Sequence, residues 1–362
     1  MNLKKLGALA FAVATIINTT GCGDEASSLT EPPVNPDYVE QTTEATTEAV
    51  TEVPAEANIA NPLTGEKDYN ADAVGKRPVA VMVNNLKDAL PQYGIEQADI
   101  IYEIPVEGGI TRLMAVYADY TSMPDICSVR SCRYYYPIIA LGMDAIYCHW
   151  GADQTIAMDT LNRTGIDRLD GANENDIFLR DDERAKKYAS EHTGYLKGSA
   201  IPGKIESKGF RTDINSRNAE GCFNFAEDKV TPADMTAVSV QVKFSNSYYS
   251  DFEYDEATGE YLKFHSGKPH IDGRTEKQIG FENVIILQSD IHTRSCGYLM
   301  DVGLTGGTGY YVSNGGAQSI TWKKESETSP IKLYDASGSE LEVNVGESYI
   351  GIIGSEKPIT IE

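Results

Sequence analysis

The stretch from Gly23 to Ala60 sets the strongest limit on what this chain can fold into. It contains no Lys or Arg, nine acidic residues and four prolines, and Thr–Glu pairs recur through TTEATTEAVTEV. Such a composition buries too little apolar surface to offset the entropy lost on folding, and its like charges repel one another. The sequence therefore predicts a disordered acidic linker over residues 22–60 and confines the folded part to residues 61–362.

The segment before this linker has the order of an export signal. Lys4 and Lys5 precede an uncharged apolar stretch, Leu6–Ile17. A membrane-spanning helix needs about 20 apolar residues, so this stretch is more typical of a signal peptide. It ends in Thr-Thr-Gly-Cys, which resembles the lipobox of bacterial lipoproteins except at Thr19, where an aliphatic residue is usual. We expect a signal peptide over residues 1–21 and lipidation of Cys22 on the extracytoplasmic face of the cell membrane. The alternative is an ordinary secretory signal with a chance cysteine.

The charge and length of the chain narrow its class. Its net charge is −23, and the part from Asn61 onward holds 29 basic and 45 acidic residues. Because phosphate binding needs basic surface, no nucleic-acid partner is expected. No cofactor is expected either, since the glycine-rich GLTGGTGYYVSNGG lacks the Lys–Ser/Thr pair and following helix of a phosphate-binding loop. Roughly 300 residues suit two domains.

Residues 61–230 mix helical and strand patterns. RPVAVMVNN predicts a buried strand, and DIIYEIPV and ITRLMAVYAD predict a strand pair around the Gly108–Gly109 turn. SCRYYYPIIALGM and ADQTIAMDTLNRT have helical spacing, and DAIYCHWG reads as a short strand. RDDERAKKYASEHTGYL is charged along one side, which predicts an exposed helix. We expect a mixed α/β domain here.

From about Ala233 the pattern changes to short strands separated by turn residues. Examples are VSVQVKF, DFEYDEATGEYLKFHSG, NVIILQ, AQSITWKK and SYIGII. Such spacing is typical of antiparallel β structure. Pro232 lies in a polar stretch, which places the boundary near residue 230 and the second domain over residues 231–362. The predicted fold class is α+β: an N-terminal mixed α/β domain followed by a mainly antiparallel β domain.

Five cysteines follow Cys22, and they form no C-x-x-C motif. Buried or free thiols are the favoured interpretation. A Cys127–Cys132 disulfide is an alternative in an oxidising setting. A zinc site built from Cys127, Cys132, Cys148 and His149 is a weaker alternative, since the spacing matches no standard zinc module.

Charged residues interrupt apolar segments of the first domain. Paired carboxylates can act as general acid and base, arginines can clamp carboxylate or phosphate, and a histidine at a strand end can be a base or a ligand. The candidate cluster comprises Glu103, Glu107, Arg112, Arg130, Arg133 and His149. The competing interpretation is an internal ion-pair network in which the arginines neutralise the two glutamates.

Three further residues are secondary candidates. His192 ends the charged segment, where a solvated surface histidine is the usual case. His270 and Asp272 are two apart and face the same way if extended, as an aspartate-oriented imidazole would require. No recognisable nucleophile motif accompanies them.

Several long strings together resemble the YerB-like lipoproteins, a bacterial family of unknown function with two tandem domains. The strings include PQYGIEQADIIYEIPVEGGITRLMAVY, SVRSCRYYYPIIALGMDAIYCHWG, GKPHIDGRTEKQIGFENVIILQ and GTGYYVSNGGAQSITWKKES. The resemblance implies an extracytoplasmic lipoprotein with an N-terminal α/β domain and a β-rich C-terminal domain. Cys127 and Cys132 stand where the family usually has small residues, which implies that these thiols are not its shared chemistry.

These observations favour a non-enzymatic lipoprotein that binds or scaffolds a peptidoglycan fragment or an envelope protein through the polar cluster. The first alternative is a cell-wall hydrolase or transferase with Glu103 or Glu107 as acid/base and His149 or His192 in support. The second is a metal-binding lipoprotein.

Overall fold

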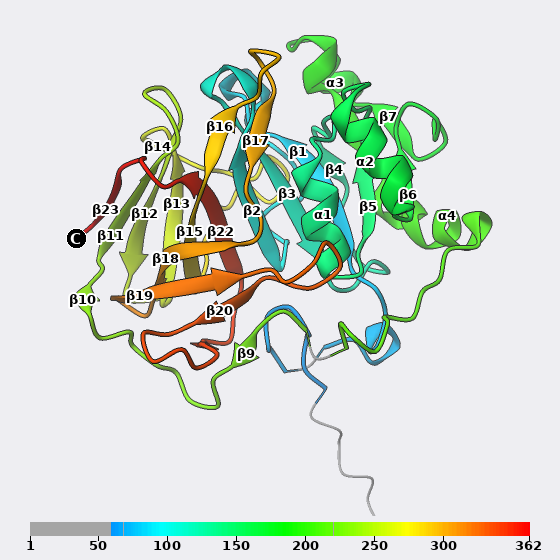
Figure 1. The fold of residues 1–362 in the computed structure, drawn as a ribbon. Coiled ribbons are helices and arrows are strands. Elements are labelled where there is room, and N and C mark those ends of the chain that lie inside the picture. The colour runs from blue at the N-terminus through cyan, green and yellow to red at the C-terminus, as the bar shows by residue number, and fades with distance from the viewer. Residues whose placement is uncertain (1–58, 68, 220) are drawn as a thin grey trace, which may run out of the picture. The chain divides into compact units, whose positions relative to one another are not determined.

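One long sheet runs through both halves of the folded part (Figure 1). The computed structural model describes residues 59–67, 69–219 and 221–362. The predicted signal peptide, Cys22 and residues 23–58 of the predicted linker lie outside the described residues. No helix in the described ranges combines the length and the apolar character that crossing a membrane requires.

The sheet has eleven strands, and its order interleaves the N-terminal and C-terminal halves. In spatial order they are β10 (Met235–Thr236), β19 (Gly316–Lys323), β18 (Gly306–Ser313), β15 (Asn283–Ser289), β22 (Ser348–Gly354), β2 (Ile100–Pro105), β3 (Thr111–Tyr117), β1 (Val79–Asn84), β5 (Ile146–His149) and β6 (Arg168–Asp170), with β20 (Lys332–Tyr334) beside β19. The parallel β2–β22 pair, which aligns Ile100 with Ser348, joins the two halves. The division at residue 230 stays a prediction, and the sheet crosses it.

Both faces of this sheet are buried around β1, which explains why β1 reads as a continuous apolar run. Val79, Val81 and Val83 belong to one core, while Ala80 and Met82 belong to the other. Successive side chains of a strand point to opposite faces, so a strand covered on both sides needs apolar residues throughout. The predicted buried strand is confirmed.

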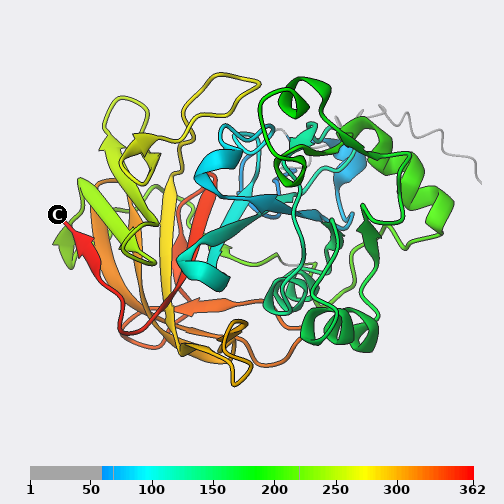
Figure 2. The ribbon, with the colours of Figure 1, turned by 90° about the horizontal axis from the view of Figure 1, so that it is seen from above.

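Different elements cover the two faces. On one face pack α1 (Tyr135–Gly142) and α2 (Ile156–Thr164). On the other face pack α4 (Ile201–Lys208), a three-stranded sheet and a five-stranded antiparallel sheet. The two smaller sheets comprise β4 (Ile126–Cys127), β8 (Gly194–Leu196) and β7 (Phe178–Arg180), and β14 (Lys268–Pro269), β13 (Glu260–His265), β12 (Tyr249–Asp255), β11 (Ser239–Lys243) and β23 (Ile359–Ile361). Figure 2 shows the N-terminal helices at one end and the five-stranded sheet at the other.

Short elements complete the fold. They are the hairpin β16 (Ile291–Thr293) and β17 (Met300–Val302), the pair β9 (Asn224–Phe225) and β21 (Glu342–Val343), helix α3 (Asp182–Ala185), and the 3-10 turns Ala71–Ala73, Lys87–Ala89, Glu107–Gly109, Ser190–His192 and Gly198–Ala200. The predicted α+β class is confirmed, with a mixed sheet toward the N-terminus and antiparallel pairs in the C-terminal half. The predicted strand pair around Gly108–Gly109 is confirmed as β2 and β3.

The predicted charged helix over RDDERAKKYASEHTGYL is wrong in extent. Only α3 is helical there, and Arg180 pairs with Gly194 in a β ladder. Arg184 is buried and donates hydrogen bonds to the carbonyls of Ala89, Pro91 and His192. The segment packs against neighbouring backbone through the buried Arg184 side chain. In an exposed helix this side chain would point into solvent instead.

Candidate functional site

The structure separates the predicted polar cluster instead of bringing its six residues together. On β2 the side chain of Glu103 shares the face of Ile101, toward the five-stranded sheet. On β3 Arg112 is opposite Ile104 and shares the face of Met114, toward α1. Because the strand repeat is two residues, Glu103 and Arg112 point to opposite sides of one sheet. Arg112 therefore does not neutralise Glu103.

Glu103 lies in a dry polar network between β2 and the five-stranded sheet. Its Oε1 accepts hydrogen bonds from Asn85 (3.0 Å) and Thr111 (2.7 Å). Its Oε2 accepts from Ser250 (2.7 Å) and Tyr349 (3.0 Å). The ammonium of Lys263, itself fully buried, lies 3.4 Å from Oε2 and donates to Ser250 Oγ.

Glu103 and Lys263 each stabilise the charged form of the other. Burial raises the pKa of Glu103, but Lys263 and the hydroxyls of Thr111 and Ser250 outweigh it, so the net pKa is lowered. Burial lowers the pKa of Lys263, and Glu103 opposes that shift. A carboxylate with every oxygen occupied and an ammonium as partner is the arrangement that buried charges require.

The network extends to the histidines. Gln92 links Asn85 to His270, whose Nε2 lies 2.8 Å from Gln92 Oε1. His265 Nε2 lies 3.1 Å from the carbonyl oxygen of Asn85. Burial, assisted by Lys263, lowers the pKa of His265 to about 4 and that of His270 well below its usual range. Both imidazoles are therefore neutral at ordinary pH.

The remaining secondary candidates are also buried. His192 is 6% exposed and lies 2.9 Å from Asn84 Nδ2, so the expected surface position is wrong. Asp272 accepts hydrogen bonds from the backbone of Glu96 and Arg274. Within the described ranges no hydrogen bond joins His270 to Asp272, so the aspartate-oriented imidazole is not formed.

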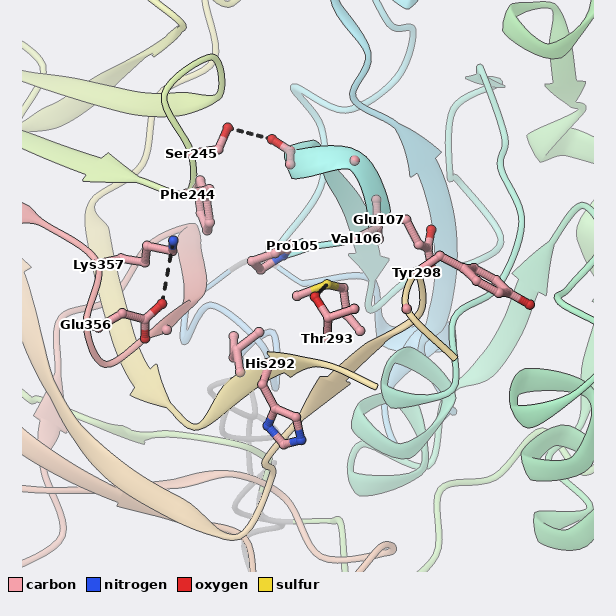
Figure 3. A pocket seen from close by; sticks show the side chains of 16 residues that line it. Pro105, Val106, Glu107, Phe244, Ser245, His292, Thr293, Tyr298, Glu356 and Lys357 are labelled. Carbon is pink, nitrogen blue, oxygen red and sulfur yellow. Dashed lines mark hydrogen bonds and ion pairs between the residues drawn. The ribbon is translucent and has the colours of Figure 1, made fainter. Parts of the chain in front are cut away.

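Glu107 lies in a different setting, on the turn after β2. Its carboxylate receives a two-point contact from Arg133, with Nε at 2.6 Å and Nη2 at 2.8 Å. Together with Pro105, Phe244, His292 and others, Glu107 lines a cavity of about 510 Å³, here called the Glu107 cavity. Figure 3 shows Glu107 and Lys357 on opposite sides of this cavity.

The position of the Glu107 cavity follows from the sheet. Strands β15, β22 and β2 are parallel. The lining comes from the ends of these strands and the residues just after them: Ile291–Thr293 after β15, Gly354, Glu356 and Lys357 at the end of β22, and Pro105–Gly109 at the end of β2. In open α/β sheets, ligands bind at the carboxyl ends of parallel strands because the loops there converge on one edge. The segment after β15 is the hairpin β16–β17, which forms one wall of the cavity and carries Tyr298, 60% exposed.

Arg112 and Arg130 lie near Arg133. Arg112 is buried and donates to the carbonyl of Ser131. Burial and the neighbouring guanidinium groups of Arg133 and Arg130 lower the pKa of Arg112 to about 10. Of the six predicted cluster residues, the structure thus groups Glu107, Arg112, Arg130 and Arg133, and sets Glu103 apart.

His149 is fully buried at the end of β5, where its ring packs 5.3 Å from that of Tyr147. Its Nδ1 lies 2.9 Å from the carbonyl oxygen of Gly151, and Asp170 lies 3.8 Å away. Burial lowers its pKa. Tyr147 belongs to the core on the α1 face, so His149 lies across the sheet from Glu103 and does not share a cleft with it.

All five cysteines of the described ranges are free thiols, and all but Cys296 are buried. The alternative Cys127–Cys132 disulfide is therefore not formed. Burial raises the pKa of Cys127 and Cys132 to about 12. The described residues contain no group of three His, Cys, Asp or Glu side chains placed to hold a metal ion.

Sequence reasoning missed the partners that decide the site. Lys263 and Ser250 lie on interior strands of a region expected to be plain β structure, and Arg180 lies in the segment expected to be a helix. One signal was available: Lys263 interrupts the alternating strand EYLKFH, whose apolar neighbours include Tyr261. The local sequence pattern did not predict that Lys263 would face Glu103 on β2.

Family models and a curated relative match this chain over most of its length. Residues 63–211 match the N-terminal domain, and residues 240–350 the C-terminal domain, of a family described as protein of unknown function (DUF3048). YerB of Bacillus subtilis (strain 168), which is named as a lipoprotein, is 27% identical over 299 residues, 81% of this chain and 85% of YerB.

A solved structure agrees with this match. The crystal structure of the Bacillus subtilis YerB protein has a TM-score of 0.72 and 26% identity, and the alignment covers 83% of this chain and 99% of that chain. Both domains, their order and the fold are thus shared over nearly the whole described part. The chain belongs to the YerB-like family, with the DUF3048 N-terminal and C-terminal domains in tandem.

Proposed function

We propose that this protein is anchored through lipid on Cys22 to the extracytoplasmic face of the membrane and binds a cell-envelope ligand in the Glu107 cavity. The single observation that carries the binding proposal is a cavity of about 510 Å³ at the carboxyl ends of three parallel strands. Ligand sites of soluble proteins have volumes of this order and favour this position. The lipoprotein name of YerB and the predicted export signal support the anchor.

The lining of the Glu107 cavity suits a ligand with both polar and apolar faces. Phe244 and Met300 supply apolar surface, while Glu107, His292 and Lys357 supply hydrogen-bonding groups. The two-point contact from Arg133 fixes the Glu107 carboxylate in one orientation, so it is positioned before a ligand arrives. We favour a peptidoglycan fragment, because its sugars and peptide stems carry hydroxyls, amides and amines on a partly apolar frame.

The test is binding of purified soluble muropeptides to the detergent-solubilised full-length protein. Glu107→Gln and Tyr298→Ala should each weaken binding about ten-fold, the loss expected for a central contact of a small interface. Glu183→Gln is the matched control, because Glu183 is an exposed carboxylate outside the cavity. Binding that is absent from the wild type, or equal in all four proteins, would exclude this ligand site.

The anchor has its own test. Metabolic labelling with palmitate should mark the wild type and Cys296→Ser, and should not mark Cys22→Ser. Cys296 is the suitable control because its thiol is exposed in the described part. Label that persists in Cys22→Ser would show that the lipid is attached elsewhere, and an unlabelled wild type would exclude the anchor.

A further inference from the structure

A second cavity, of about 230 Å³, lies beside Trp150 and is lined by two arginines. We propose that this arginine–tryptophan pocket binds a phosphoryl group carried by a cell-envelope molecule. Its lining residues are Val129, Arg130, Trp150, Arg180, Ser190 and Glu191. None of these lines the Glu107 cavity, so the proposal goes beyond the function above and can fail independently of it.

The indole of Trp150 packs directly against two glycines, where a side chain would collide with it. A Cβ atom at Gly171 would lie 2.6 Å from the ring Cδ2, and one at Gly194 would lie 3.0 Å from the ring Cε3. Phe178 meets the ring edge-on with centroids 5.8 Å apart. The guanidinium carbon of Arg180 lies 4.1 Å from the indole centroid, within cation–π range. Trp150 therefore forms a fixed wall that also holds Arg180.

Both arginines are oriented but retain free donors. Arg130 Nη1 donates to the carbonyl of Glu191 at 3.4 Å, and Arg180 Nη1 donates to the carbonyl of Ser190 at 2.6 Å. A guanidinium has five N–H donors, and these contacts use one nitrogen of each. In the part of the chain that the structure describes, neither arginine has a carboxylate oxygen within ion-pair distance.

Neighbouring guanidinium groups make the electrostatic environment of Arg130 more positive. Burial lowers the pKa of Arg130; Glu191 opposes that shift, and the guanidinium groups of Arg133 and Arg180 add to it. The chain has a net charge of −23, so carboxylates are plentiful. Among the six residues that line this pocket, however, only Glu191 carries one. Arg130 is half-buried and Arg180 is exposed, and two like charges on one pocket favour an anionic ligand that relieves their repulsion.

A phosphoryl group fits better than a carboxylate. Arg130 follows β4 and Arg180 ends β7, so the two forks approach from different segments. A carboxylate satisfies one fork with its two oxygens, whereas a tetrahedral phosphoryl group offers further oxygens to a second fork. Trp150 leaves an apolar wall for the carrier. The phosphoryl group would come either from a lipid headgroup or from a soluble glycerol phosphate.

The experiment is a tryptophan fluorescence titration of the full-length protein with inorganic phosphate. The chain has two tryptophans, and Trp322 is buried at 1% exposure, so a response should come from Trp150. We expect a saturable change that Trp322→Phe keeps and Trp150→Phe loses. Arg130→Gln/Arg180→Gln should raise Kd about ten- to hundred-fold, as loss of charge-assisted hydrogen bonds implies.

Two controls separate binding from folding and from net charge. Arg163→Gln/Arg217→Gln removes the same two charges from exposed positions outside the pocket, and should leave Kd within about two-fold of the wild type. Arg180→Lys keeps the charge and an exposed position but not the fork, and should weaken binding about ten-fold. Equal Kd values in all these variants, or no saturable response in the wild type, would overturn the proposal.

Competition then identifies the source. Displacement of phosphate by sn-glycerol 3-phosphate supports a soluble carrier, and displacement only by short-chain dihexanoyl phosphatidylglycerol supports a lipid headgroup. If neither competes, the pocket holds an adventitious ion only, and the proposed envelope ligand is excluded.

Discussion

Glu103 and Glu107 are four residues apart, yet they lie in two different chemical settings. Glu103 is 1% exposed, and hydroxyl, amide and ammonium partners occupy both its oxygens. Glu107 is half-buried on a turn, with one arginine partner and an open cavity beside it. The strand ends between them: Glu103 lies inside β2, whereas Glu107 lies in the turn that follows.

The contrast shows that a charged residue within an apolar segment has no single meaning. Glu103 closes the contact between β2 and the five-stranded sheet, so its polar partners are structural. Glu107 remains accessible from a cavity and is held in one orientation by Arg133. The ion-pair interpretation from sequence, in which arginines neutralise the two glutamates, fits Glu107, which Arg133 contacts, but not Glu103, whose cation is Lys263. The ligand pocket is proposed for Glu107.

The largest difference between the two glutamates is expected when the ammonium of Lys263 is removed from the dry network. Lys263→Met leaves the Glu103 carboxylate buried without its counter-charge, so the free energy of unfolding should fall by about 3–5 kcal/mol. Equilibrium urea unfolding measures the change. Arg133→Met, which removes the cation beside Glu107, should cost far less, because that carboxylate keeps some access to water.

A double variant keeps the first prediction testable. In Glu103→Gln/Lys263→Met no charge remains in the network, so most of the lost stability should return. The single variant Glu103→Gln is measured beside Lys263→Met. If the losses of the two single variants simply add in the double variant, the pair does not couple, and the network does not act as one unit.

A second prediction concerns Asp99, a half-buried carboxylate that, unlike Glu103, is not paired with a cation in the described part. Burial raises its pKa to about 6, against opposing hydrogen bonds from Ala118 and Asn61. The folded state keeps this proton to a higher pH than the unfolded state does, so this group lowers stability as pH rises from about 4 to about 6, and the deficit persists above. Asp99→Asn should therefore raise the free energy of unfolding by roughly 1–3 kcal/mol near pH 7.5.

The check is urea unfolding of both proteins at several pH values. The advantage of Asp99→Asn should shrink as pH falls below about 5. Glu103 provides the opposite sign, because its lowered folded pKa supplies stability that is lost as pH falls through that value. An Asp99→Asn advantage that is the same at every pH would contradict the argument.

The smallest effect is expected at the cavity. Glu107→Gln should change the free energy of unfolding by about 1 kcal/mol or less, as is usual for a partly solvated ion pair. Thermal unfolding monitored by circular dichroism measures it. A loss comparable to that of Lys263→Met would place Glu107 in the structural core and remove the distinction between the two glutamates.

Local pattern predicted much of the scaffold. The alternation and apolar runs of β1, β2 and β3 were readable because their burial follows strand periodicity. The segment around Arg184 was misread, because its charges suggested solvent although one of them turns inward to backbone carbonyls. Likewise Arg112 and Glu103 looked like partners until strand pairing showed which face each side chain takes.

The α+β class and the family followed from the sequence alone, because they depend on short-range periodicity and on strings in order. The acidic linker and the anchor at Cys22 are likewise predictions from composition and motif, and they stay predictions. The partners of Glu103 depend on the three-dimensional arrangement of the strands. Tyr349 lies 246 residues away from it, and it meets Glu103 because the sheet places β22 beside β2. The order of strands in a sheet is set by long-range packing, which no local pattern encodes.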